Sequence, residues 1–210
     1  MAAILTQNVP VIPAVVLAAG LSSRMGRPKA NLLLPNGDTF LSRIVATFLE
    51  AEIDDVIVVV GHDAEAVAAG GSEAGQRRVR PRFVVNPDYE NGQFSSVLAG
   101  LRAIDRPGVA GMLLTLVDVP LVSAATVRAV VTHYRNTRAA IVRPTSGARH
   151  GHPVLIDRSV FDALRRADPA EGAKPVVRAY ASAIGDLAIT DEGAFRDVDT
   201  PEDYERIRQA

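Results

Sequence analysis

The sequence predicts an α/β protein, a three-layer αβα sandwich built around a mainly parallel sheet. Short runs rich in Val, Ile and Leu lack the alternation of half-exposed strands, as expected for strands that are covered on both faces. Segments with a helical apolar period lie between these runs. Strand and helix therefore alternate along the chain, which is the order typical of a parallel sheet with helices on both faces.

The expected strands are five apolar runs, at residues 14–18, 56–60, 82–86, 111–117 and 139–143. The expected helices lie at residues 40–51, 93–104 and 123–134, where apolar side chains recur on one helical face. Ser123 is the expected N-cap of the last helix, because its hydroxyl can accept a hydrogen bond from the first helical turn.

The composition excludes several classes of function. The chain has 210 residues and a formal net charge of -1, so no overall field attracts nucleic acid or an anionic membrane. It has no cysteine, which excludes disulfides, zinc–cysteine sites and thiol catalysis. No apolar run approaches the roughly 18 residues of a membrane span, and the first residues lack the basic region of a signal peptide. We expect a cytoplasmic protein that forms a single domain over residues 1–210 and binds neither nucleic acid nor membrane.

Parallel sheets bind ligands beyond the carboxyl ends of their strands. We therefore expect the chemistry of this protein at residues 18–29, 61–63, 86–96 and 118–120, which follow four of the predicted strands.

The segment VVLAAGLSSRMGRPKANLLL, residues 15–34, leaves the first strand through a glycine loop that carries two cations. The spacing of Gly20 and Gly26 fits neither the dinucleotide fingerprint nor the Walker A pattern. The next convincing helix begins near Phe40, so an anion here would not lie on a helix N-terminus. What remains is a loop whose backbone can approach a phosphate chain, with Arg24 and Lys29 to neutralise it.

The string LAAGLSSRMGRPKANLLL resembles the signature of the MobA-like NTP transferase family, which includes the molybdopterin nucleotidyltransferases; Asn31 is the departure. The resemblance implies a Rossmann-like fold of the nucleotide-diphospho-sugar transferase type, with a nucleotide-binding half at about 14–120 and an acceptor-binding half at about 121–210. It implies that Arg24, Lys29 and Asp118 are catalytic. The implied nucleotide-binding residues are Leu17, Ala18, Ala19, Gly20, Arg24, Lys29, Gly92 and Ser96.

Two carboxylates are candidate metal ligands. Asp118 closes the apolar run LLTLVDVP, where it could hold Mg²⁺ against a triphosphate, although a plain strand-ending turn is an equal interpretation. Near the C-terminus, Thr200 and Asp203 have the spacing of a capping box, so we expect Asp203 to be structural. By resemblance, Asp199 is the second metal ligand, with Asp197 as the alternative.

The second half of the chain carries the expected acceptor site. By resemblance, His152 in the segment GHPVL borders the pocket for the second substrate. Lys174 stands where the family has arginine, which keeps the charge but loses bidentate recognition. For Ser95, next to Ser96, a helix-start role is as good an interpretation as base contact.

The activity that the resemblance implies is transfer of CMP from CTP to a molybdopterin-type cofactor, with Mg²⁺ and release of pyrophosphate. CTP is favoured because the loop reads LAAG, in which the methyl group of Ala19 could restrict a purine. The alternatives are GTP, a different phosphorylated acceptor, an NAD(P)H-dependent oxidoreductase, and a non-catalytic cofactor carrier. A molybdoenzyme or its chaperone is the implied protein partner.

Overall fold

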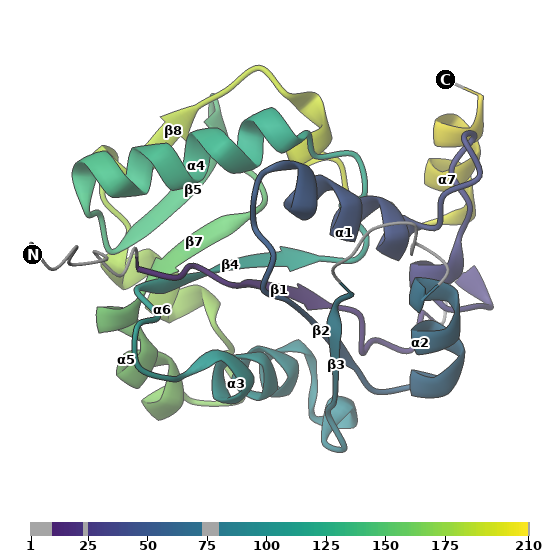
Figure 1. The fold of residues 1–210 in the computed structure, drawn as a ribbon, viewed down its shortest axis with the longest axis horizontal. Coiled ribbons are helices and arrows are strands. Elements are labelled where there is room, and N and C mark those ends of the chain that lie inside the picture. Colours follow the sequence, from purple (N-terminus) through teal and green to yellow (C-terminus); the bar gives the residue numbers. More distant parts are fainter. Residues whose placement is uncertain (1–9, 23–24, 73–79, 210) are drawn as a thin grey trace, which may run out of the picture.

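The computed structural model describes residues 10–22, 25–72 and 80–209, and its centre is an eight-stranded sheet with helices on both faces (Figure 1). The strands are β1 (Ala14–Leu17), β2 (Val56–Val60), β3 (Arg82–Val85), β4 (Gly111–Leu116), β5 (Ile141–Ser146), β6 (Arg149–His150), β7 (Val154–Asp157) and β8 (Asp186–Ala188). The fold class predicted from the sequence is confirmed.

The strand order is β3-β2-β1-β4-β7-β5-β6, with β8 paired to β5. Strands β1 to β4 are mutually parallel, and Val15 of β1 lies between Ile57 and Leu114 of its two neighbours. Strand β7 runs antiparallel to both β4 and β5. The connection from the end of β5 at Ser146 to the start of β7 at Val154 is too short for the crossover that a parallel pair needs.

The helices form two layers. One face is covered by α1 (Phe40–Glu50), α2 (Ala64–Ser72) and α4 (Ala124–Thr137), and the other by α3 (Gln93–Ile104), α5 (Phe161–Arg166) and α6 (Lys174–Tyr180) (Figure 1). Successive residues of a strand point to opposite faces of the sheet and pack against different helix layers. Val58 of β2 belongs to the apolar cluster under the first layer, and Val59 belongs to the cluster under the second. This explains the continuous apolar runs, because both sides of each central strand are buried.

The last helix, α7 (Pro201–Arg208), packs outside these layers against the segment that follows the glycine loop. The ring of Tyr204 meets Phe40 edge-on at 5.9 Å, and its hydroxyl donates to the Leu33 carbonyl at 2.8 Å. These contacts bring the end of the chain back to the carboxyl ends of β1 and β4.

The predicted strands and helices are present, but β5 begins and ends later than expected and α4 extends beyond its predicted end to Thr137. Ser123 caps α4 as predicted, since its hydroxyl accepts from the Thr126 amide. Helices α2, α5 and α6 and the short strands β6, β7 and β8 had no prediction. None of the helices in the described part of the chain is long and apolar enough to span a membrane.

Candidate active site

One lysine joins two carboxylates at the carboxyl end of the sheet. Lys29 Nζ lies 3.2 Å from Asp118 Oδ2 and 2.6 Å from Asp199 Oδ1. The lysine side chain is 12% exposed, whereas those of Asp118 and Asp199 are 20% and 41% exposed. Lys29, Asp118 and Asp199 are far apart in the sequence and were all predicted as site residues. In the structure the two carboxylates meet at the ammonium group of the lysine.

The glycine loop fixes the backbone of Lys29. Ser22 has a left-handed φ of 49°, and Gly26 has a φ of 65°, a conformation that glycine adopts without strain. The Met25 amide donates to the Ser22 carbonyl at 2.8 Å, and the Lys29 amide donates to Ser22 Oγ at 3.1 Å. The loop thus closes on itself and directs the lysine toward the carboxylates. Arg24 lies outside the described residues, so its proposed role stays a prediction.

Asp118 lies just beyond β4, separated from its last residue by Val117, and so at the end of the strand as the sequence predicts. Its carbonyl accepts a hydrogen bond of 2.8 Å from the Val198 amide, which ties residues 197–199 to the end of the strand. Within the described part of the chain, Asp118 Oδ1 is a buried oxygen without a hydrogen-bond partner. A buried carboxylate oxygen normally has a partner, so this atom is suited to a ligand.

Asp199 immediately precedes the N-cap of α7. Thr200 Oγ1 accepts from the Asp203 amide at 3.2 Å, and the Asp203 carboxylate accepts from the Thr200 amide at 3.0 Å. The predicted capping box is therefore confirmed, and Asp203 has the structural role expected of it. Because Thr200 and Asp203 form the cap, the Asp199 carboxylate is not needed for it, and its Oδ1 lies 2.6 Å from Lys29 Nζ.

His152 and Asp197 border the same site. Burial lowers the pKa of His152, against the opposing effects of the Leu114 carbonyl and the carboxylates of Asp197 and Asp118. Loss of hydration raises the pKa of Asp197, and the negative charge of Asp118 adds to this effect. The imidazole is accordingly neutral near pH 7, and Nδ1 lies 3.4 Å from the Leu114 carbonyl.

The predicted nucleotide-binding residues at the end of β1 are mostly buried. Leu17, Ala18 and Ala19 are at most 6% exposed, whereas Gly20 is exposed. The methyl group of Ala19 belongs to the apolar cluster beneath α3, so any effect of position 19 on the choice of base acts through the backbone. The Ala19 carbonyl accepts from the His62 amide at 3.4 Å.

At the start of α3, Gly92 is exposed with a φ of 91°, whereas Ser96 is only 3% exposed. Asn86 Nδ2 donates to Ser95 Oγ at 2.8 Å and to Ser96 Oγ at 3.0 Å. Fully buried Asn86 organises this corner, a role that was not predicted. Its signal in the sequence is a polar residue that closes an apolar strand just before a proline.

Lys174 is exposed at the first residue of α6. In the described residues, no hydrogen bond or ion pair joins it to Lys29, Asp118 or Asp199, so its assignment to the acceptor site stays a prediction. The same residues contain no group of three or more His, Asp or Glu side chains arranged to hold a metal ion. What the described residues offer a cation is the pair of carboxylates of Asp118 and Asp199.

The chain is similar to known proteins over nearly its whole length. The chain is 31% identical over 207 residues to nicotine blue oxidoreductase of Paenarthrobacter nicotinovorans, covering 95% of this chain and 98% of that protein. It is 29% identical to the molybdenum cofactor guanylyltransferase of Rhizobium meliloti (strain 1021), covering 94% of this chain and 89% of the relative.

Among solved structures, Rv0371c from Mycobacterium tuberculosis H37Rv aligns with a TM-score of 0.78 at 31% identity, covering 96% of this chain and 99% of that one. Its complex with manganese aligns with a TM-score of 0.75 at 29% identity, covering 96% and 100%. The sequence profile of the MobA-like NTP transferase domain matches residues 14–184. The chain thus belongs to the MobA-like NTP transferase family of nucleotidyltransferase enzymes.

Proposed function

We propose that this nucleotidyltransferase transfers CMP from CTP to a molybdopterin-type cofactor and releases pyrophosphate. The observation that carries the proposal is the meeting of Lys29 with Asp118 and Asp199 beside the glycine loop. Cofactor transfer is supported by the full-length similarity to a molybdenum cofactor guanylyltransferase. The nucleotide would lie over residues 14–120 and the acceptor over residues 121–210.

In the proposed reaction, a phosphate oxygen of the acceptor attacks the α-phosphorus of the nucleotide. The new P–O bond forms as the bond to the β-phosphate breaks, and pyrophosphate leaves with the bridging oxygen. Because the attacking oxygen is already anionic, no strong general base is required. The contribution of the protein is to position the reactants and stabilise charge, and Lys29 and Arg24 would hold the triphosphate and the departing pyrophosphate.

Asp118 and Asp199 fit a divalent ion. Both carboxylates already converge on one cationic group, and Asp118 Oδ1 is buried without a partner among the described residues. Mg²⁺ usually takes one or two carboxylates together with phosphate oxygens, which matches a pair of ligands. When bound, Mg²⁺ would neutralise charge on the α-phosphate and the acceptor. The manganese complex of Rv0371c supports the use of a divalent ion.

Lys29 would then leave the carboxylates for the triphosphate. Within the described residues, its ammonium group bonds to these two carboxylates alone, and its backbone stays fixed by Ser22. A flexible four-carbon stem allows this movement without a change in the loop. Asp199 is preferred over Asp197 as second ligand because it shares the ammonium group with Asp118.

A second candidate is oxidoreductase activity with a nicotinamide cofactor. It is favoured by the similarity to nicotine blue oxidoreductase over nearly the whole of both chains. The spacing of the glycines in the first loop is against it, because it lacks the dinucleotide fingerprint. A carrier that delivers the cofactor to a molybdoenzyme or its chaperone would bind the pterin without releasing pyrophosphate. The cytoplasmic location stays a prediction.

One experiment separates these functions. The purified protein is incubated with Mg²⁺ or Mn²⁺, each NTP in turn, and molybdopterin cofactor or a sugar phosphate, and pyrophosphate is measured. We expect release only with CTP and the molybdopterin cofactor. Release with GTP would change the nucleotide, and release with a sugar phosphate would change the acceptor. NAD(P)H consumption with no pyrophosphate from any pair would favour the oxidoreductase.

A further inference from the structure

A cavity of about 550 Å³ lies beside the turn that follows β4. Its lining residues are Leu121, Arg149, Glu192, Gly193, Phe195 and Arg196. They come from three places in the chain: the turn after β4, the hairpin arm β6, and the segment before Asp197. Only His152 and Lys174 were assigned to an acceptor, and neither lines this cavity.

The wall that carries Phe195 is held tightly. A Cβ atom at Gly193 would lie 2.1 Å from the Leu121 carbonyl oxygen, and one at Gly151 would lie 2.9 Å from the Phe195 ring. Asp191 accepts hydrogen bonds from the Ser123 amide at 2.9 Å and from the Gly193 amide at 3.0 Å. The cavity is therefore built by close packing at the N-terminus of α4 rather than by a loose surface loop.

The lining combines an aromatic ring with cations. The Arg149 guanidinium lies 4.9 Å from the centre of the Phe195 ring. Its two terminal nitrogens donate to the two oxygens of Glu192, each at 2.8 Å. These hydrogen bonds keep the pKa of Glu192 below its usual value, so the group is a carboxylate near neutral pH. Arg196 is an exposed second cation on the same wall.

Two residues that line the cavity lie close in the sequence to Asp118 and Asp197. Leu121 is three residues after Asp118, and Arg196 directly precedes Asp197 in the segment whose Val198 amide binds the Asp118 carbonyl. In the sheet, β6 lies at the opposite end from β3 and β2. A molecule in the cavity would thus approach Asp118 from the side opposite a nucleotide over β1 to β3.

We propose that this cavity is the subsite for a planar, anionic heteroaromatic group of the acceptor. Its ring replaces the Arg149 guanidinium over Phe195, and its anionic group takes the Arg149 fork from Glu192 with Arg196 alongside. This inference rests on the proposed nucleotidyl transfer and adds residues that select the acceptor. A guanidinium fork recognises planar anions in two-point contact, and an aromatic ring stacks on any flat heterocycle.

The test measures binding without nucleotide, with pterin-6-carboxylate as a fluorescent planar anion and glucose 6-phosphate as a non-planar competitor. Arg149→Gln and Phe195→Leu are expected to weaken binding of the pterin by about tenfold each, as loss of a charge-assisted or stacking contact would. Glu192→Gln is expected to tighten it about threefold, because the competing carboxylate is gone. Arg208→Gln is the matched control, since Arg208 also pairs with a glutamate and lies over a tyrosine ring.

The inference is overturned by either of two results. One is that the wild-type protein fails to bind the pterin at millimolar concentration, or binds glucose 6-phosphate equally well. The other is that Arg149→Gln and Glu192→Gln leave the affinity unchanged. Pyrophosphate release with CTP and the cofactor is measured in the same preparations. If either overturning result is found while pyrophosphate is still released, the subsite alone is refuted. If the pterin binds as expected but no pyrophosphate is released, the proposed nucleotidyl transfer is refuted.

Discussion

Replacing Lys29 with methionine removes the ammonium group that Asp118 and Asp199 share. In the structure this group bridges one oxygen of each carboxylate, at 3.2 Å from Asp118 Oδ2 and 2.6 Å from Asp199 Oδ1. A divalent ion must displace it before it can bind the same oxygens. Lys29→Met therefore removes this competing ammonium group, and we expect the variant to bind Mn²⁺ more tightly than the wild type in the absence of nucleotide.

The magnitude follows from the two ion pairs. Exposed pairs contribute about 0.2–1 kcal/mol, and the 12% exposure of the lysine favours the upper end of that range. Two pairs at about 1 kcal/mol each give about 2 kcal/mol, which corresponds to a factor of about 30 in affinity. Because part of this free energy is regained by hydration of the carboxylates, we expect a gain of about tenfold to thirtyfold.

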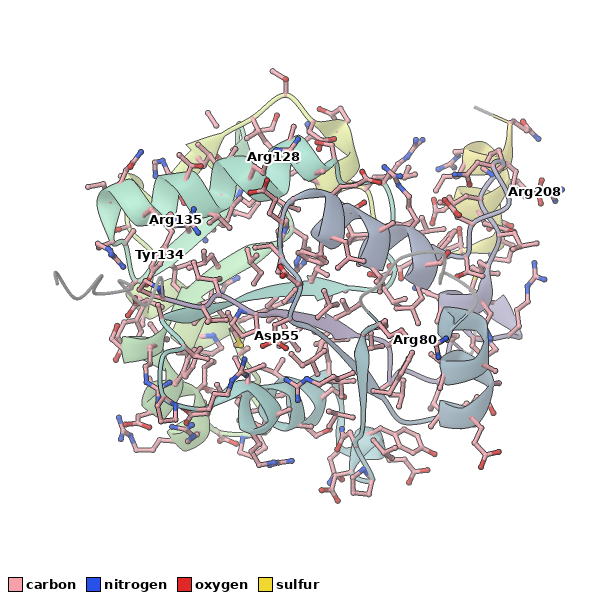
Figure 2. All side chains as sticks on the ribbon, in the orientation of Figure 1. Asp55, Arg80, Arg128, Tyr134, Arg135 and Arg208 are labelled. Carbon is pink, nitrogen blue, oxygen red and sulfur yellow. The ribbon has the colours of Figure 1, made fainter. Side chains whose placement is uncertain are left out.

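The assay is titration of Mn²⁺ followed by electron paramagnetic resonance, which counts free ion. Arg135→Gln is a control for the loss of one positive charge, because Arg135 lies in the last turn of α4, on the opposite side of the molecule from α7 (Figure 2). It should leave Mn²⁺ affinity unchanged. Equal or weaker Mn²⁺ binding by Lys29→Met would refute the view that lysine and metal compete for one pair of carboxylates.

Three further variants test the supports of the site. Thr200→Ala should lower the free energy of unfolding by about 1 kcal/mol in urea titrations, because α7 loses its N-cap; an unchanged midpoint would contradict the capping role of Thr200 with Asp203. Asp191→Asn should lower the free energy of unfolding by about 2 kcal/mol near neutral pH, since several hydrogen bonds to a carboxylate are weakened. Because the pKa of Asp191 is lowered in the folded protein, the difference from the wild type should shrink as the pH falls below 3.8. A difference that does not change with pH would contradict this. Burial, with a hydrogen bond to Asp157, raises the pKa of Tyr134 from 10.0 to about 12. The free energy of unfolding of the wild type should therefore fall between these pH values, whereas that of Tyr134→Phe should lack this fall. Parallel plots of unfolding free energy against pH for the two proteins would refute this.

The sequence predicts the parts of the site that follow from strand order. Asp118 and the glycine loop both end buried apolar strands, and parallel neighbours place their carboxyl ends at one edge. Capping chemistry distinguishes Asp203 from Asp199 in the sequence itself, because the helix needs one of these residues and not the other.

Contacts between distant segments are less accessible from the sequence. The approach of Asp199 to Lys29 depends on Tyr204 of α7 packing against Phe40 of α1, a contact between distant segments that no local pattern encodes. The cavity lined by Arg149 and Phe195 depends on a two-residue strand and a short turn, which have too few residues for a periodic signal. The antiparallel β7 was missed for the same reason.

The central claim is that the pair Asp118 and Asp199, with Lys29, transfers a nucleotidyl group. The most direct test follows label from [α-³²P]CTP into molybdopterin cofactor, with pyrophosphate measured in parallel, for the wild type, Asp118→Ala and Lys29→Ala. The account predicts equal amounts of labelled product and pyrophosphate with the wild type, and neither with the two variants, although both remain folded by circular dichroism. Full transfer by either folded variant would contradict it.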